Sequence, residues 1–351
     1  MGIDIFLSSA SRQGYSQDMV DLFAKPTGAF HQYRYASKWI AEEVIGRISS
    51  GEYAKKPQVM LCFIDQGTKN ITPVLLPVRF ATIEGVREHG TTRSIQFRLG
   101  GFCKVADVGK FNEIMRSRFK AMPEYVGGNI QGKYWLYDDA GVKYAVESSD
   151  TLGDWEALIE QYYALPNPVE ELPFYRFEWI RDVASNCEVK PGFQNGELTY
   201  ELAGGREYGV SIYHYHPSRD FPDVSLQIFC SDGQLTPVNG DSRVLHTRYD
   251  RKSYRIIAKQ AMLGSRTTLS FRRTEHVSGK LIWEDVLLRV NIKPSLLYAA
   301  GYVLAIAIGF AMPFVVRTAD DPTNAASIIG AAIFGGVIVG VATLLKDKLR
   351  L

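Results

Sequence analysis

The first 165 residues alternate between segments with strand-like and helix-like spacing of apolar residues. Strand-like segments are rich in β-branched and aromatic residues, and they comprise residues 29–36, 58–65, 72–86 and 93–105. Apolar residues recur every three or four positions in three further segments, which predicts amphipathic helices over residues 37–51, 108–122 and 151–165. Ser37 is the predicted cap of the first helix, and Thr151 or Asp154 begins the last. We therefore predict a mixed α+β domain over residues 1–165, with a curved sheet or small barrel.

A proline-rich segment at residues 166–173 then predicts a linker, because Pro166, Pro168 and Pro173 break regular structure. Helical spacing disappears beyond it. Short aromatic or β-branched segments are separated by Gly, Pro, Asp and Asn, and they comprise residues 174–183, 196–204, 208–216, 223–233, 253–260, 267–275 and 281–293. This pattern predicts a β-sandwich over residues 174–294, of immunoglobulin-like size but without the Cys-Trp-Cys signature of true immunoglobulin domains.

Two uncharged apolar stretches follow, Leu296–Val316 and Ala325–Leu345, each of 21 residues. As a helix each would be roughly 31 Å long, which matches the roughly 30 Å hydrocarbon core of a bilayer. A buried helix of a soluble protein is the alternative. The sequence thus predicts a transmembrane helical hairpin over residues 295–346, followed by a basic tail at residues 347–351.

The charges that flank the two stretches predict the orientation of this hairpin. Basic residues lie before the first stretch and after the second, namely Arg289, Lys293, Lys346, Lys348 and Arg350. The connecting loop holds only Arg317, beside Asp320 and Asp321. By the positive-inside rule both termini are cytoplasmic. We therefore predict a multi-pass protein of the bacterial inner membrane, which agrees with four scattered cysteines and the lack of a signal-peptide pattern.

Small residues recur at four-residue steps in both stretches: Gly301, Ala305 and Gly309, then Ala332, Gly336 and Gly340. Such spacing lets helix backbones approach closely in lipid. The contact could lie within one hairpin or between protomers, and two stripes favour a homo-oligomer. Because no charged residue lies within the spans, a pathway through such an assembly would be apolar and poorly selective.

Charge is nearly balanced over the whole chain, with 40 basic and 38 acidic residues, which gives no global case for nucleic-acid binding. Locally, residues 243–280 hold ten basic residues against two acidic ones. This stretch could lie against anionic lipid, could bind a nucleotide or short single strand, or could be a solvated surface. The candidate ligand-binding residues are Arg243, Arg248, Tyr249, Arg251, Lys252, Arg255 and Lys259.

Signals for catalysis are weak. The chain contains no nucleophile elbow, Walker loop or HExxH motif. His214 and His216 lie two apart on one face of a predicted strand and could bind a metal, but exposed strand histidines explain them equally well. We therefore expect no catalytic residue, no metal and no cofactor, and a membrane-tethered enzyme is the least favoured class.

The combination of a sensor-like region with a C-terminal two-helix membrane segment resembles the membrane effectors of bacterial anti-phage defence systems. These include effectors paired with nucleotidyltransferases, in cyclic-nucleotide systems and in the Hailong type. The resemblance concerns architecture alone, namely residues 296–345, the preceding β-rich domain and the basic stretch 243–280. It implies an oligomeric pore opened by a nucleotide or oligonucleotide signal, with a nucleotidyltransferase as partner. The alternative is a membrane-anchored binding or scaffold protein with a passive hairpin.

Overall fold

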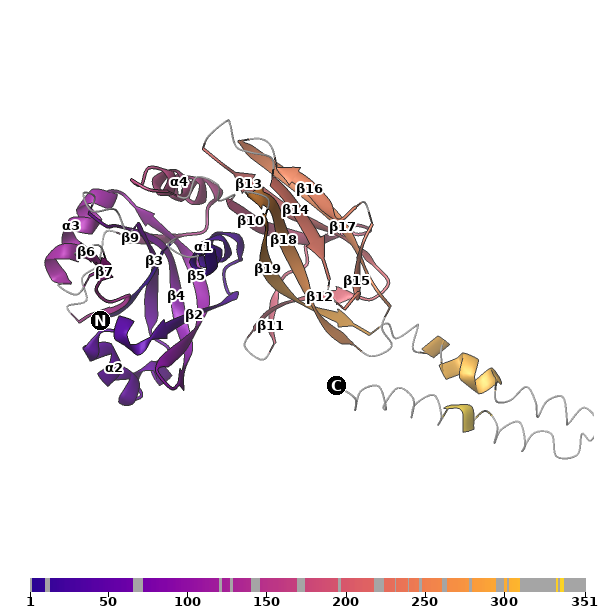
Figure 1. Cartoon of the computed structure of the whole chain (residues 1–351). Coiled ribbons are helices and arrows are strands. Elements are labelled where there is room, and N and C mark those ends of the chain that lie inside the picture. Colours follow the sequence, from indigo (N-terminus) through magenta and orange to yellow (C-terminus); the bar gives the residue numbers. More distant parts are fainter. Residues whose placement is uncertain are drawn as a thin grey trace, which may run out of the picture.

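The computed structural model of the chain describes most of the first 294 residues and a few beyond them (Figure 1). The described residues are 2–9, 13–65, 72–119, 122–126, 129–139, 146–168, 174–194, 197–217, 224–230, 232–238, 240–245, 248–260, 264–277, 280–294, 300–301, 303–309, 333 and 335–337.

A seven-stranded sheet organises the first part of the chain. Its strands are β1 (Ile3–Ser8), β2 (Phe30–Ala36), β3 (Gln58–Asp65), β4 (Val74–His89), β5 (Thr92–Val105), β8 (Trp135–Asp138) and β9 (Val146–Ser149). The order is β2-β5-β4-β3-β1-β8, and β9 pairs with β5. Only β1 and β3 run parallel within this sheet. Two register shifts between β4 and β5 bend the long hairpin. A separate short hairpin joins β6 (Glu124–Val126) to β7 (Asn129–Gln131).

Helices cover this sheet at positions that the sequence predicted in part. They are α1 (Gln13–Ala24), α2 (Glu42–Ser49), α3 (Val108–Arg118) and α4 (Leu152–Tyr163), with 3-10 turns η1 (Ser37–Trp39) and η2 (Glu52–Lys55). The predictions for α3 and α4 are confirmed, and Thr151 caps α4 by accepting a hydrogen bond from the Asp154 backbone N–H at 3.2 Å. The predicted Ser37 cap is wrong, because Ser37 begins the separate turn η1 and α2 starts after Ala41.

The second part of the chain consists of two further sheets. One has the order β10-β13-β17-β15, with β10 (Phe174–Asp182), β13 (Glu207–Tyr215), β17 (Tyr249–Ala258) and β15 (Leu235–Pro237). The other has the order β11-β12-β19-β18-β14-β16, with β11 (Gly192–Gln194), β12 (Glu197–Ala203), β19 (Lys280–Lys293), β18 (Ser265–Val277), β14 (Val224–Phe229) and β16 (Ser242–Leu245). Each of the seven strands predicted in this region is present.

Apolar faces of these two sheets pack against each other. Phe177 of β10 meets Tyr200 of β12 at 5.3 Å and Phe271 of β18 at 6.3 Å between ring centroids. Tyr254 of β17 is fully buried, and its hydroxyl donates to the Leu226 carbonyl of β14 at 2.7 Å. Alternation along β17 explains the arrangement, because Tyr254, Ile256 and Ala258 point inward while Arg255 and Ile257 stay exposed.

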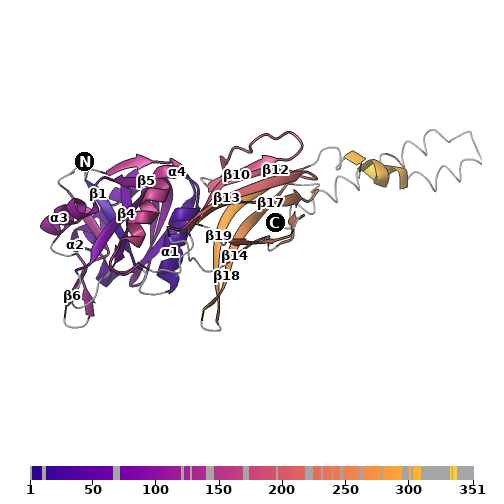
Figure 2. The same ribbon diagram turned by 90° about the horizontal axis from the view of Figure 1, so that it is seen from above.

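The two parts share one continuous hydrophobic core. Figure 2 shows α1 and α4 on the side of the first part that faces the second. Phe23 of α1 lies 4.4 Å from Phe174 of β10, and Tyr162 of α4 lies 5.1 Å from the same ring. Trp155 of α4 is fully buried and meets Tyr213 of β13 at 5.9 Å. Helices α1 and α4 therefore connect the cores of the two parts through aromatic contacts.

The fold class predicted from the sequence is wrong, because the described part of the chain is predominantly β and shows no membrane-spanning hairpin. Among the described residues, no helix is both long enough and apolar enough to cross a membrane. Most of the two predicted spans, Leu296–Val316 and Ala325–Leu345, lies outside those residues. The predicted multi-pass inner-membrane location rested on the hairpin and is contradicted by the same finding.

One close contact is present among the described residues of this region. A Cβ placed on Gly336 would lie 2.5 Å from the Ala307 Cα, and Ala307 is buried. By contrast, Gly301, Ala305 and Gly309 are exposed. Gly336 therefore lies at a close backbone approach, whereas the small-residue stripe predicted for the first stretch points away from it. Ala332 and Gly340 lie outside the described residues.

Candidate functional site

The structure places the predicted basic ligand-binding residues beside acidic partners. Arg251 donates to both carboxylate oxygens of Glu178, at 2.7 and 2.8 Å. The other ion pairs are Arg255 with Glu207 at 3.3 Å, Lys252 with Asp250 at 2.5 Å and Arg248 with Glu160 at 3.7 Å. Four of the ten basic residues of the stretch are therefore paired with acidic residues of α4, β10, β13 and β17.

The remaining members of that set do not converge on one point. Arg243 donates to the Ser242 carbonyl and lies 5.3 Å from the Tyr254 ring. Tyr249 is 65% exposed, and the Lys259 backbone N–H bonds to the Gln234 carbonyl at the far end of β17. Neither of the two cavities described below is lined by these residues, and binding of nucleotide by them stays a prediction.

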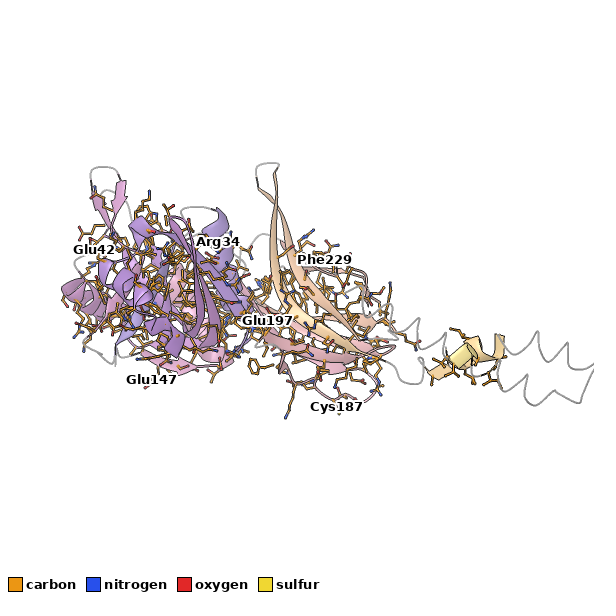
Figure 3. All side chains as sticks on the ribbon, turned by 90° about the horizontal axis from the view of Figure 1, so that it is seen from below. Arg34, Glu42, Glu147, Cys187, Glu197 and Phe229 are labelled. Carbon is orange, nitrogen blue, oxygen red and sulfur yellow. The ribbon has the colours of Figure 1, made fainter. Side chains whose placement is uncertain are left out.

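A cleft between the two parts of the chain brings polar groups together instead. Its cavity of about 330 Å³ lies between α1, β2 and β5 on one side and β12 and β19 on the other. Figure 3 places Glu197 of β12 at this junction. The ionisable and amide side chains that line the cavity are Asp18, Asp21, Lys25, His31, Gln32, Gln96, Glu197 and Arg289. A cavity of this size fits a small organic molecule.

His31 of β2 forms the floor of the cleft. The residue is only 4% exposed, and its ring packs edge-on against Tyr33 at 4.8 Å. Its Nδ1 lies 3.6 Å from Asp21 Oδ2, and its Nε2 lies 3.8 Å from Asp18 Oδ1. Nε2 has no hydrogen-bond partner among the described residues. Asp21 favours a proton on Nδ1, so Nε2 is left as a buried acceptor next to a cavity.

The two carboxyl groups beside His31 differ in charge because their surroundings differ. Lys25 bonds to Asp21 at 2.5 Å. Burial alone would raise the pKa of Asp21, but Lys25 and His31 together lower it. Burial, and then the charge of Asp21, raises the pKa of Asp18 to about 8. Burial lowers the pKa of His31, which is therefore neutral at physiological pH. The cluster at neutral pH thus comprises an ionised Asp21 bonded to Lys25, a neutral His31 and a protonated Asp18.

Strands β12 and β19 of the second part line the side of the cleft opposite α1 and β2. Arg289 of β19 lies 3.5 Å from Glu197 of β12, and it donates to Thr268 at 3.1 Å. Phe193 of β11 reaches across to the first part, where the Arg98 guanidinium lies 4.7 Å from its ring. Gly28 makes this approach possible, because it has φ +91° and a Cβ there would meet Phe193 at 3.1 Å.

A second cavity, of about 600 Å³, lies beside Arg47, Arg118 and Tyr137 in the first part. Arg47 stacks 3.5 Å from the Tyr137 ring and bonds to buried Asp4 at 3.0 Å. Asp4 also accepts from Tyr53 at 2.6 Å, and Arg118 lies 3.2 Å from Asp138. Both arginines are thus engaged, which indicates a structural role in fixing β1 and β8.

The predicted histidine pair is buried rather than exposed. His214 Nδ1 lies 3.0 Å from the Phe174 carbonyl, and His216 packs against Tyr163 at 4.6 Å. The part of the chain that the structure describes contains no group of three His, Cys, Asp or Glu side chains suited to a metal ion. Cys62 and Cys103 are buried, which raises the pKa of both thiols and disfavours the reactive thiolate.

Comparisons with known proteins give no identity. No protein-family model matches the chain, and no curated protein matches it. One similar solved structure is the Vibrio cholerae VesB protease, with 7% identity over 63% of this chain and 82% of that one. Its TM-score of 0.18 is too low for any argument about fold or function.

The sequence did not reveal the cleft. Asp18, Asp21 and Lys25 show helical spacing, which could have indicated α1. His31 lay in a predicted strand, but its position opposite Asp18 depends on how α1 packs on the sheet. Glu197 and Arg289 reach the site only because β12 and β19 pair in parallel. No local pattern encodes that pairing.

Proposed function

We propose that this chain is a binding protein that takes a small polar molecule in the cleft between its two parts. One observation carries the proposal: the buried Nε2 of His31 has no hydrogen-bond partner among the described residues and lies at the floor of an inter-domain cavity. Leaving a buried polar atom unpaired costs about 1–3 kcal/mol, so natural proteins usually supply a water or a ligand.

The electrostatics of the site support the same function. A carboxyl group with a strongly raised pKa in a cleft is typical of functional sites. Asp18 and His31 come from the first part, whereas Glu197 and Arg289 come from the second. A ligand that contacts both parts would favour the arrangement in which they fit it best, which is how a sensor converts binding into a conformational change.

This proposal retains the ligand-sensing half of the function predicted from the sequence. The membrane pore and the passive membrane tether both depended on the hairpin, which the described residues do not show. The nucleotide or oligonucleotide signal, the homo-oligomer, the nucleotidyltransferase partner and the role in anti-phage defence stay predictions. The basic residues of β17 supply no further support for a nucleotide, because their ion pairs occupy them.

A ligand screen with a blocked cleft tests the proposal. The melting temperature of the full chain is measured with a panel of small amines, sugars, carboxylates, amino acids and nucleosides. Gln96→Trp places an indole in the cavity from an exposed position of β5, and Glu147→Trp on β9 is the matched surface control (Figure 3). We expect at least one compound to raise the melting temperature of the parent and of Glu147→Trp but not of Gln96→Trp. No shift from any class, or equal shifts in all three proteins, would refute the proposal.

A further inference from the structure

We propose that the ligand of the cleft carries a protonated amine, which is bound between the Asp18 carboxylate and His31 Nε2. This inference rests on the proposed function and names the chemical class of molecule that the same site takes.

Hydrogen-bond acceptors without donors define the polar end of the cavity. His31 Nε2 is one, and Asp18 Oδ1 lies 3.8 Å from it. Hydrogen bonds from an ammonium group are about 2.9 Å long, so its N–H groups can reach two acceptors at this separation. When Asp18 is ionised, its Oδ1 and His31 Nε2 are therefore two acceptors without a donor among the described residues, and an ammonium group can donate to both.

The basic residues near Asp18 are paired with other carboxylates, so an ionised Asp18 would lack a counter-charge. On α1, Lys25 is bonded to Asp21. On the second part, Arg289 of β19 faces Glu197 of β12 at 3.5 Å. His31 and Tyr33 of β2 are neutral, because burial lowers the pKa of the former and raises that of the latter. Within the described ranges, Asp18 lies at ion-pair distance from no lysine or arginine. An ammonium group would supply its counter-charge.

Anionic ligands fit this end of the cavity poorly. A phosphate or carboxylate there would meet the lone pair of His31 Nε2 and, once Asp18 is ionised, a second negative charge. The two cations of the lining, Lys25 and Arg289, are already paired with Asp21 and Glu197. The apolar lining by Leu198, Leu287 and Leu288 instead suits the alkyl chain of an organic amine. The site therefore selects an organic cation with at least one N–H donor.

Binding of such a cation is coupled to the release of a proton. In the empty cleft Asp18 keeps its proton at pH 7, because burial and the Asp21 charge raise its pKa. The ammonium group requires the carboxylate, so about one proton leaves for each amine bound. Affinity consequently rises about tenfold from pH 6 to 7 and about fivefold from pH 7 to 8, because the pH approaches the pKa of Asp18.

Isothermal titration calorimetry of the full chain tests the inference. The probes are n-butylamine, putrescine and agmatine, with n-butanol and butyrate as neutral and anionic counterparts. Titrations at pH 6, 7 and 8 in two buffers with different ionisation enthalpies measure the number of protons released. We expect at least one amine to bind with release of about one proton at pH 7, and the two counterparts not to bind.

The variant Asp18→Asn distinguishes binding of the amine at Asp18 from binding elsewhere on the protein. The variant should bind the same amine at least tenfold more weakly and without proton release. Glu43→Gln, on exposed α2 beside the other cavity, is the control and should match the parent. Failure of all three amines, equal binding of butanol or butyrate, or an unchanged Asp18→Asn would overturn the inference. If another compound class still shifts the melting temperature in a Gln96-dependent way, the proposed function survives that failure.

Discussion

The hydroxyl of Tyr213 donates a 2.5 Å hydrogen bond to Glu156 Oε1, and Tyr215 makes an equal bond to Glu160. Two carboxylates four residues apart on α4 thus match two phenols that are two residues apart on β13. The spacings agree because four residues of helix rise about 6 Å and two residues of strand about 6.6 Å. Helix α4 is thereby attached in register to the sheet of the second part.

We expect removal of these hydroxyls to weaken the attachment of α4. Tyr213→Phe and Tyr215→Phe should each lower the free energy of unfolding by about 1 kcal/mol, because each loses a bond to a partly exposed carboxylate. Urea denaturation measures the change. Tyr249→Phe is the control, since Tyr249 is 65% exposed, and it should leave stability unchanged. Equal effects at Tyr213 and Tyr249 would contradict the role of this pairing.

Gly28 should be intolerant of any side chain. Gly28→Ala is expected to cost about 1–2 kcal/mol, because alanine is strained at φ +91° and its Cβ meets Phe193 and Leu198. Gly46→Ala on α2 is the matched control, since a Cβ there meets nothing within 4 Å. The control should gain up to about 1 kcal/mol through helix propensity. Thermal unfolding of both variants distinguishes the two effects, and a loss in Gly46→Ala would argue against this reasoning.

Asp18 should make the protein less stable as the pH rises. Its pKa is 3.8 in the unfolded chain and about 8 in the folded one. Between these values the folded state binds more protons, so the free energy of unfolding falls with rising pH. Asp18→Asn removes this dependence. We expect the variant to equal the parent near pH 4 and to exceed it by about 2 kcal/mol at pH 8, a value discounted for partial exposure.

We expect Asp21→Asn to change the free energy of unfolding in the opposite direction to Asp18→Asn. The folded-state pKa of Asp21 is lowered, so its contribution to stability is present above the unfolded pKa and is lost as the pH falls. The variant should therefore be less stable than the parent at pH 7. Denaturation curves from pH 4 to 8 test both variants, and parallel behaviour of the two would contradict the charge assignment in the cleft.

Arg79 should be among the most sensitive positions in the first part. It is fully buried and donates to the carbonyls of Leu22, Lys25 and Gly100, each at 2.7 Å. Arg79→Met leaves these acceptors unpaired and should cost about 3 kcal/mol or more. Arg79→Lys keeps the charge but not the planar fork, so an intermediate loss is expected. Arg93→Met, on the partly exposed end of β5, is the control for urea denaturation.

Local patterns predicted the strands better than they predicted the site. Alternation along β17 identifies that strand, because one of its faces is buried, whereas β13 is a continuous β-branched and aromatic segment that is buried on both faces from Val210 to Tyr215. The ion pairs of β17 escaped prediction, since Glu178 lies 73 residues from Arg251 in the sequence. An excess of basic residues along the chain is therefore no measure of charge in the fold.

Helix α1 and the predicted hairpin show two further limits of the sequence. The segment before Met19 is polar, so α1 was missed although Leu22 and Phe23 are fully buried. Hydropathy and length alone predicted two transmembrane helices over residues 296–345. Neither property reports whether a long helix is formed, and the described residues contain none that could span a bilayer.

The contact between α1 and β19 has a consequence for biogenesis. The Gln17 side-chain amide lies 3.5 Å from the Asp285 carbonyl, and 268 residues separate the two. Arg289, on the same strand, completes the roof of the cleft. A ribosome must therefore translate beyond residue 289 before the cleft is complete. Nascent chains that stall earlier are not expected to bind the proposed ligand. Until β19 is synthesised, the side of α1 that carries Asp18 and Asp21 stays exposed to solvent. It can then associate with other nascent chains or bind chaperones.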